Sequence, residues 1–177
     1  MVTPGGINAA AGPFMDDLAR ASRRARTLDG GSMDAIGILE KEHEDAKEAM
    51  HAIFASKPGD KKRLFSALKR DLELHDRIEE QVFDPMVEAH LKTAGFQARD
   101  KQAHEDVEAA LARLDALAID DKDWAPSFLA MQALLLRHVA DEEVNIFGAV
   151  RKHVSAGALE ALGQQMRAAK AEQHKAA

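Results

Sequence analysis

The sequence predicts an all-α protein, an antiparallel four-helix bundle whose helices run up, down, up and down. Of its 177 residues, 46% are hydrophobic but only 5% aromatic, and Ala, Leu, Glu, Lys and Arg are abundant, a composition that favours helices. Apolar residues also recur every three or four positions along four long segments, the period of a helix with one buried face. The length suits one domain with one core.

The boundaries of each part follow from this spacing and from turn residues. We expect an N-terminal extension over 1–31 that contains a short amphipathic helix, because glycines end its apolar pattern. The bundle is expected over 32–154, with Ser32 capping its first helix. The second helix should end early or kink near Pro85. A C-terminal helix and tail are expected over 155–177.

Composition also excludes several classes of function. Cysteine is absent, which rules out disulfides, thiolate catalysis, iron–sulfur clusters and cysteine zinc sites. The net charge of −6 comes from interspersed charges, so no nucleic-acid partner is expected. The chain has neither an apolar run of membrane-spanning length nor a signal-peptide pattern. We therefore expect no membrane span and a cytoplasmic location.

Two histidine motifs each occur in both halves of the chain. The copies are His43 with His104, 61 residues apart, and His75-x-x-x-Glu79-Glu80 with His138-x-x-x-Glu142-Glu143, 63 residues apart. All of these histidines interrupt apolar stripes, so they should point into the core. Since the offsets are nearly constant, pseudo-two-fold packing of two helical hairpins would bring the copies face to face.

This pattern predicts a metal site. Residues four positions apart lie on one helix face, so each His-x-x-x-Glu pair can converge on one ion or bridge two. Buried carboxylates without partners are costly, and a metal pair satisfies all six groups together. Imidazole and carboxylate ligands suit iron, with zinc or manganese as alternatives. The predicted ligands are His43, His75, Glu79, His104, His138 and Glu142.

The order His, His-x-x-x-Glu, His, His-x-x-x-Glu over about residues 33–153 resembles the hemerythrin-like, or HHE cation-binding, family. The resemblance implies two non-haem irons, one served by His43 and His75, the other by His104 and His138. It implies that Glu79 and Glu142 bridge them. It further implies binding of oxygen or a related small ligand, such as nitric oxide or peroxide-derived species, for sensing, storage or detoxification rather than catalysis.

Three further residues qualify this expectation. Glu108 stands where hemerythrins carry another histidine, and its i+4 spacing from His104 predicts a seventh ligand. Glu143 stands where they carry an aspartate ligand, so it rivals Glu142 as the bridge. Leu135 lies one turn before His138 and should limit water access to the ligand pocket.

Two other functions are weighed against ligand binding. A ferritin-like di-iron oxidase, which handles iron as an enzyme, usually has two Glu-x-x-His motifs; here Glu40-x-x-His43 matches, but Lys101 occupies the corresponding position before His104. A histidine phosphotransfer bundle would present an exposed histidine, whereas these histidines lie on apolar stripes.

Overall fold

The structure is a computed structural model that describes residues 33–91 and 96–176. Within those ranges the chain is helical, with short turns and no strand. The accessory helix predicted within 1–31 lies outside the described residues. None of the described helices is long and apolar enough to cross a membrane.

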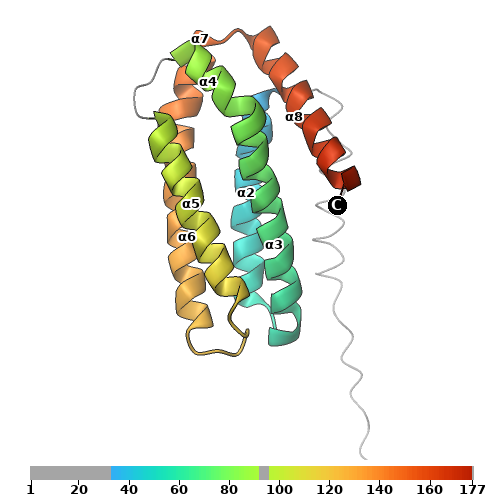
Figure 1. The fold of residues 1–177 in the computed structure, drawn as a ribbon, viewed down its shortest axis with the longest axis vertical. Coiled ribbons are helices and arrows are strands. Elements are labelled where there is room, and N and C mark those ends of the chain that lie inside the picture. Colours follow the sequence, from blue (N-terminus) through green and yellow to red (C-terminus); the bar gives the residue numbers. More distant parts are fainter. Residues whose placement is uncertain (1–32, 92–95, 177) are drawn as a thin grey trace, which may run out of the picture. The chain divides into compact units, whose positions relative to one another are not determined.

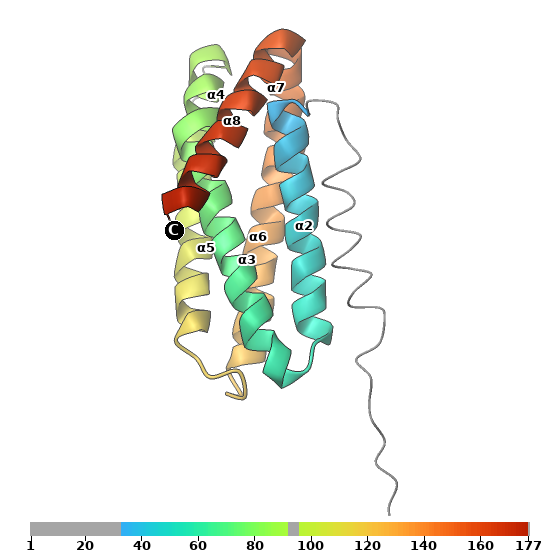
Figure 2. The ribbon, with the colours of Figure 1, turned by 90° about the vertical axis from the view of Figure 1, so that its right-hand side faces the viewer.

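Four long helical segments form the bundle, and successive segments alternate in direction (Figure 1), as predicted. The second and fourth are each interrupted by a π-helical turn. In order the elements are α2 (Ala35–Ala55); α3 (Pro58–Ile78), η1 (Glu79–Phe83) and α4 (Asp84–Leu91); α5 (Phe96–Asp115); α6 (Trp124–Asp141), η2 (Glu142–Phe147) and α7 (Gly148–His153). A further helix, α8 (Ala156–Ala176), crosses the α2–α3 hairpin (Figure 2).

Local signals set the helix starts, with one correction. Helix α2 begins after Asp34, whose Oδ1 accepts a hydrogen bond from the Gly37 amide at 2.8 Å. The prediction of Ser32 as the cap is therefore wrong, because Asp34 satisfies the free amide of the first turn. Helix α3 starts with Pro58 in its first turn, where the missing amide proton costs no helical hydrogen bond.

The hydrophobic core consists of two clusters separated by a polar layer. The upper cluster includes Leu39, Ile78, Phe83, Ile146 and Phe147. The lower cluster includes Met50, Leu72, Val107, Leu135 and Val139. In each half of the bundle the histidine motifs lie between residues of the two clusters in sequence. The histidines and glutamates are therefore held in a layer with apolar packing on both sides.

The two π-helical turns occupy equivalent places in the two hairpins. Each begins at the glutamate of a His-x-x-x-Glu motif, Glu79 or Glu142, and ends at a buried phenylalanine, Phe83 or Phe147. A π-turn widens the helix by one residue and is frequent at functional sites. Of the two alternatives predicted near Pro85, the early end is wrong, since the helix passes through η1 and continues to the end of α4, while the kink stays a prediction.

Candidate metal centre

Six side chains from all four long segments of the bundle meet in the polar layer. Each is at most 5% exposed, although histidine and glutamate normally keep contact with water. They are His43 on α2, His75 on α3, Glu79 on η1, His104 on α5, His138 on α6 and Glu142 on η2.

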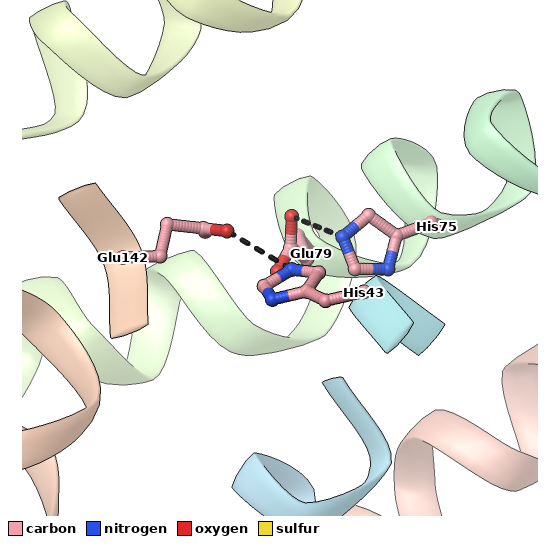
Figure 3. Close-up of side chains that lie close together, drawn as sticks. All are labelled: His43, His75, Glu79 and Glu142. Atoms are coloured by element: carbon pink, nitrogen blue, oxygen red, sulfur yellow. Dashed lines mark ion pairs between the residues drawn. The ribbon is translucent and has the colours of Figure 1, made fainter. Parts of the chain in front are cut away.

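The first half of the centre contains His43 and His75. Figure 3 shows the two imidazoles beside Glu79 and Glu142, which come from opposite hairpins. Nε2 of His43 lies 3.2 Å from Oε2 of Glu142, and Nε2 of His75 lies 3.3 Å from Oε2 of Glu79. These four residues offer ligand atoms within 4.8 Å of one another, so they could hold a metal ion.

The second half contains His104 and His138. Nε2 of His104 lies 3.5 Å from Oε2 of Glu79, and Nε2 of His138 lies 3.5 Å from Oε2 of Glu142. Each glutamate therefore faces one histidine of each pair. Glu79, His104 and His138 form a second group that could hold an ion, so the two glutamates lie between two candidate positions.

The hydrogen bonding of these groups fits bound cations. Nε2 of His43, both carboxylate oxygens of Glu79 and Oε2 of Glu142 are buried without a hydrogen-bond partner. Their near neighbours lie within ion-pair distance, but the angles do not make hydrogen bonds. Leaving such atoms unpaired in a core costs about 1–3 kcal/mol each, more for a charged group. Nitrogen and carboxylate oxygen are also the donors that iron, zinc and manganese accept.

The two central carboxyl groups have opposite pKa shifts. Burial, followed by the charge of Glu79, raises the pKa of Glu142 well above its usual value. Burial also acts to raise the pKa of Glu79, but the nearby charges of His75 and His104 outweigh it and hold that pKa well below its usual value. Two buried carboxylates this close do not both ionise unless positive charge separates them, which is what bound cations would provide.

Outer carboxylates hold two of the imidazoles by hydrogen bonds to Nδ1, and a third imidazole has a carboxylate nearby. His75 donates to Oε2 of Glu42 at 2.9 Å, and His43 donates to Oε1 of Glu143 at 3.0 Å. Nδ1 of His138 lies 3.6 Å from Oδ1 of Asp100. Such partners select the tautomer that turns Nε2 toward an ion. Nδ1 of His104 is buried without a hydrogen-bond partner.

Not all of the ligands considered in the sequence analysis face the centre in the structure. Glu108 is exposed and lines an outer pocket with Asp76 and His104, outside the ligand groups among the described residues. Glu143 is partly exposed and lies behind His43, while Glu142 faces the centre. Leu135 is buried in the lower apolar cluster, and its place in the ligand pocket stays a prediction.

Sequence reasoning did not identify Glu42 and Asp100 as partners of the histidines. Glu42 immediately precedes His43 but contacts His75 on the neighbouring helix. The equivalent residue before His104 is Ala103, so the repeat gives no signal for it. Phe147 is buried in the upper cluster and stacks on His43 with ring centroids 5.7 Å apart.

Fold and site together define a helical-bundle protein with buried histidine and glutamate groups suited to metal binding. The family model described as Hemerythrin HHE cation binding domain matches residues 34–150. The chain belongs to this family.

A solved structure shows the same fold. It is the crystal structure of a Hemerythrin HHE cation binding domain-containing protein from Mycobacterium kansasii, with a TM-score of 0.72 and 22% sequence identity. The match covers 79% of this chain and 86% of that chain. No curated protein matches the sequence.

Proposed function

We propose that this protein holds two non-haem iron ions and uses them to bind oxygen or a related small ligand, such as nitric oxide or a peroxide-derived species. The observation that carries this proposal is the buried set of four histidines and two glutamates, in which Nε2 of His43, both carboxylate oxygens of Glu79 and Oε2 of Glu142 have no hydrogen-bond partner among the described residues. Zinc and manganese remain the alternative ions for this donor set. Sensing, storage and detoxification are the roles such binding would serve.

The proposed ligand assignment follows the distances. His43 and His75 would hold one ion, His104 and His138 the other, and the central carboxylates of Glu79 and Glu142 would bridge them. Six protein ligands leave room for a small ligand, because octahedral iron accepts more donors than the shared set supplies. Glu108 is outside this assignment because its side chain is exposed. A di-iron centre supplies the electrons and the open position that oxygen or nitric oxide binding requires.

Outer pockets reach the centre from the side of the second pair. His138 and Asp100 line one pocket beside α5 and α6, and His104 lines another between α3 and α5. We infer that small ligands approach past these two histidines. The first pair is shielded more closely, since Phe147 stacks on His43 and Glu42 and Glu143 cover the outer edges of both rings.

The test is a spectrum of the iron-loaded protein. Fe²⁺ is added under anaerobic conditions, and the absorption spectrum is recorded before and after oxygen or nitric oxide is admitted. The proposal predicts new charge-transfer bands that saturate at a fixed ratio of small ligand to iron pair. An unchanged spectrum with iron bound would contradict ligand binding.

The same sample separates the ferritin-like alternative. An iron oxidase would oxidise many Fe²⁺ ions per site, whereas a binding protein would change only the ions it holds. The third helix does not repeat the Glu40-x-x-His43 motif, because the residue three before His104 is Lys101, whose side chain is 73% exposed and ion-paired with Glu105. A phosphoryl donor cannot reach the four histidines of the centre, because each is at most 5% exposed.

A further inference from the structure

Helix α8 lies beyond the residues that match the family model, 34–150, yet it packs on α2, α3 and η1. Its residues Leu159, Leu162 and Met166 are buried in the upper apolar cluster. The helix also crosses very close to the start of α2: a Cβ on Gly163 would lie 2.9 Å from the carbonyl oxygen of Met33. Glycine at this crossing therefore permits the close approach of α8 to the bundle.

The last turns of α8 reach a carboxylate that contacts a predicted metal ligand. The ammonium group of Lys170 donates to Oε1 of Glu42, and the other oxygen of Glu42 accepts from Nδ1 of His75 at 2.9 Å. Nε2 of His75 then faces Glu79 at 3.3 Å. These contacts form an unbroken line from α8 to the middle of the centre.

The environment of this line favours a strong interaction. The side chains of Lys170 and Glu42 are only 17% and 27% exposed, so water and salt screen their charges less than on an open surface. One carboxylate oxygen of Glu42 accepts from Lys170 and the other accepts from His75, so both oxygens of the acceptor are held in place.

We propose that Lys170 of α8 is a positioning residue of the metal centre, which holds Glu42 so that His75 keeps Nε2 turned toward its ion. The proposal rests on the metal binding proposed above. Without Lys170, Glu42 loses one of its two fixed partners and can turn to solvent. His75 then loses the acceptor that selects its tautomer and ring orientation, and partners of this kind typically change metal affinity by about 10–100-fold.

His43, the other histidine of the pair, has a similar series of contacts, but its lysine comes from within the bundle. Lys47 of α2 lies 3.4 Å from Oε1 of Glu143, which accepts from Nδ1 of His43. Because Lys47 and Glu143 both lie inside the matched residues, changing them perturbs the bundle itself. Lys170 allows the contribution of the added helix to be tested separately.

The test compares Lys170→Met with Arg167→Met. Arg167 lies one turn earlier on α8 and donates to the carbonyl oxygen of Met33 at 2.8 Å, so its removal loosens α8 without touching Glu42. Fe²⁺ is loaded anaerobically, and its release to a chelator is followed by absorbance. We expect about one of the two irons to leave about tenfold faster or more from Lys170→Met, with Lys170→Arg near wild type. We expect no such change from Arg167→Met.

Other outcomes overturn the proposal. Equal acceleration in both variants would show that α8 acts through packing alone, and wild-type release from Lys170→Met would show that it does not act on the centre. If Lys170→Met fails to fold, Glu42→Gln supplies the second variant, and release at the wild-type rate would again overturn it. A wild-type protein that holds no iron would instead contradict the proposed function.

Discussion

Nε2 of His104 and Nε2 of His138 lie 3.1 Å apart, with the two rings nearly perpendicular at 79°. Two imidazole nitrogens bonded to one transition metal at about 2.1 Å, with an angle of about 90–110° between them, are about 3.0–3.4 Å apart. The two side chains come from adjacent helices and therefore already have the separation that one shared ion requires.

Removing a histidine of the centre should lower the iron content per chain, while removing a histidine outside the centre should not. We expect His75→Ala and His138→Ala to lower iron content by about one ion per chain, since each removes one of the two imidazoles at an ion. His51→Ala and His90→Ala are matched controls, because both side chains are exposed. Iron per chain after desalting is the measurement, and equal losses in all four variants would contradict the assignment.

The two adjacent glutamates of η2 should behave differently. Glu142→Ala removes the carboxylate that faces His43 and His138, so iron should be lost from both positions. Glu143→Ala removes only the acceptor behind His43, which should weaken binding by about 10–100-fold while two irons still bind at saturation. Titration with Fe²⁺ distinguishes the two outcomes. A larger loss of iron from Glu143→Ala than from Glu142→Ala would show that Glu143 is the bridging ligand.

Metal loading should release protons at neutral pH. Burial acts to lower the pKa of His104, but the adjacent carboxylate of Glu79 and the charges of other nearby carboxylates outweigh burial and raise that pKa to about 9. The pKa of Glu142 is also raised well above its usual value. His104 is then protonated in the metal-free protein at pH 7, and an ion must displace that proton.

Apparent metal affinity should accordingly increase with pH up to about pH 9, where His104 is half deprotonated, and level off above it. The proton displaced from His104 contributes about tenfold in affinity per pH unit below its pKa. Calorimetric titrations in buffers with different ionisation enthalpies measure the number released. Binding without proton release at pH 7 would show that His104 is not a ligand.

Leu135 provides a test of access to the centre. It is 4% exposed in the lower apolar cluster, one turn before His138. Leu135→Asn should admit water and accelerate oxidation of the reduced iron centre without abolishing iron binding. Loss of a large buried side chain should also lower stability by about 2–5 kcal/mol.

Leu136→Asn is the control for Leu135→Asn, because the neighbouring leucine is 39% exposed. Oxidation is followed by absorbance after a mix with oxygenated buffer, and unfolding is measured separately. An oxidation rate that is equal in the two variants would show that Leu135 does not limit access.

The sequence predicted the bundle and the six inward groups because both depend on spacing along single helices. Periodic apolar residues defined the helices, and the repeat linked His75 to His138 without any knowledge of packing. The π-turns that begin at Glu79 and Glu142 could not be predicted. They depend on how two hairpins pack, since the buried phenylalanines that end the turns meet across the bundle at 5.9 Å.

Contacts between helices account for the other differences. Glu108 has the right spacing from His104 on its own helix, yet its side chain is exposed beside an outer pocket. Glu42 shows no repeat signal, yet it accepts from His75 and is held by Lys170 from a helix 128 residues further along the chain. Spacing identifies which face a side chain occupies, but not which neighbouring helix supplies its partner.

Metal analysis of the purified protein tests the central claim most directly. Protein loaded with Fe²⁺ under anaerobic conditions and freed of excess metal should contain about two irons per chain, because Glu79 and Glu142 each lie within ion-pair distance of one histidine of either pair. The variant Glu79→Ala, prepared in parallel, should retain little iron. Two results would contradict the account. One is a wild-type protein that binds no iron, and the other is a Glu79→Ala variant that retains as much iron as the wild-type protein.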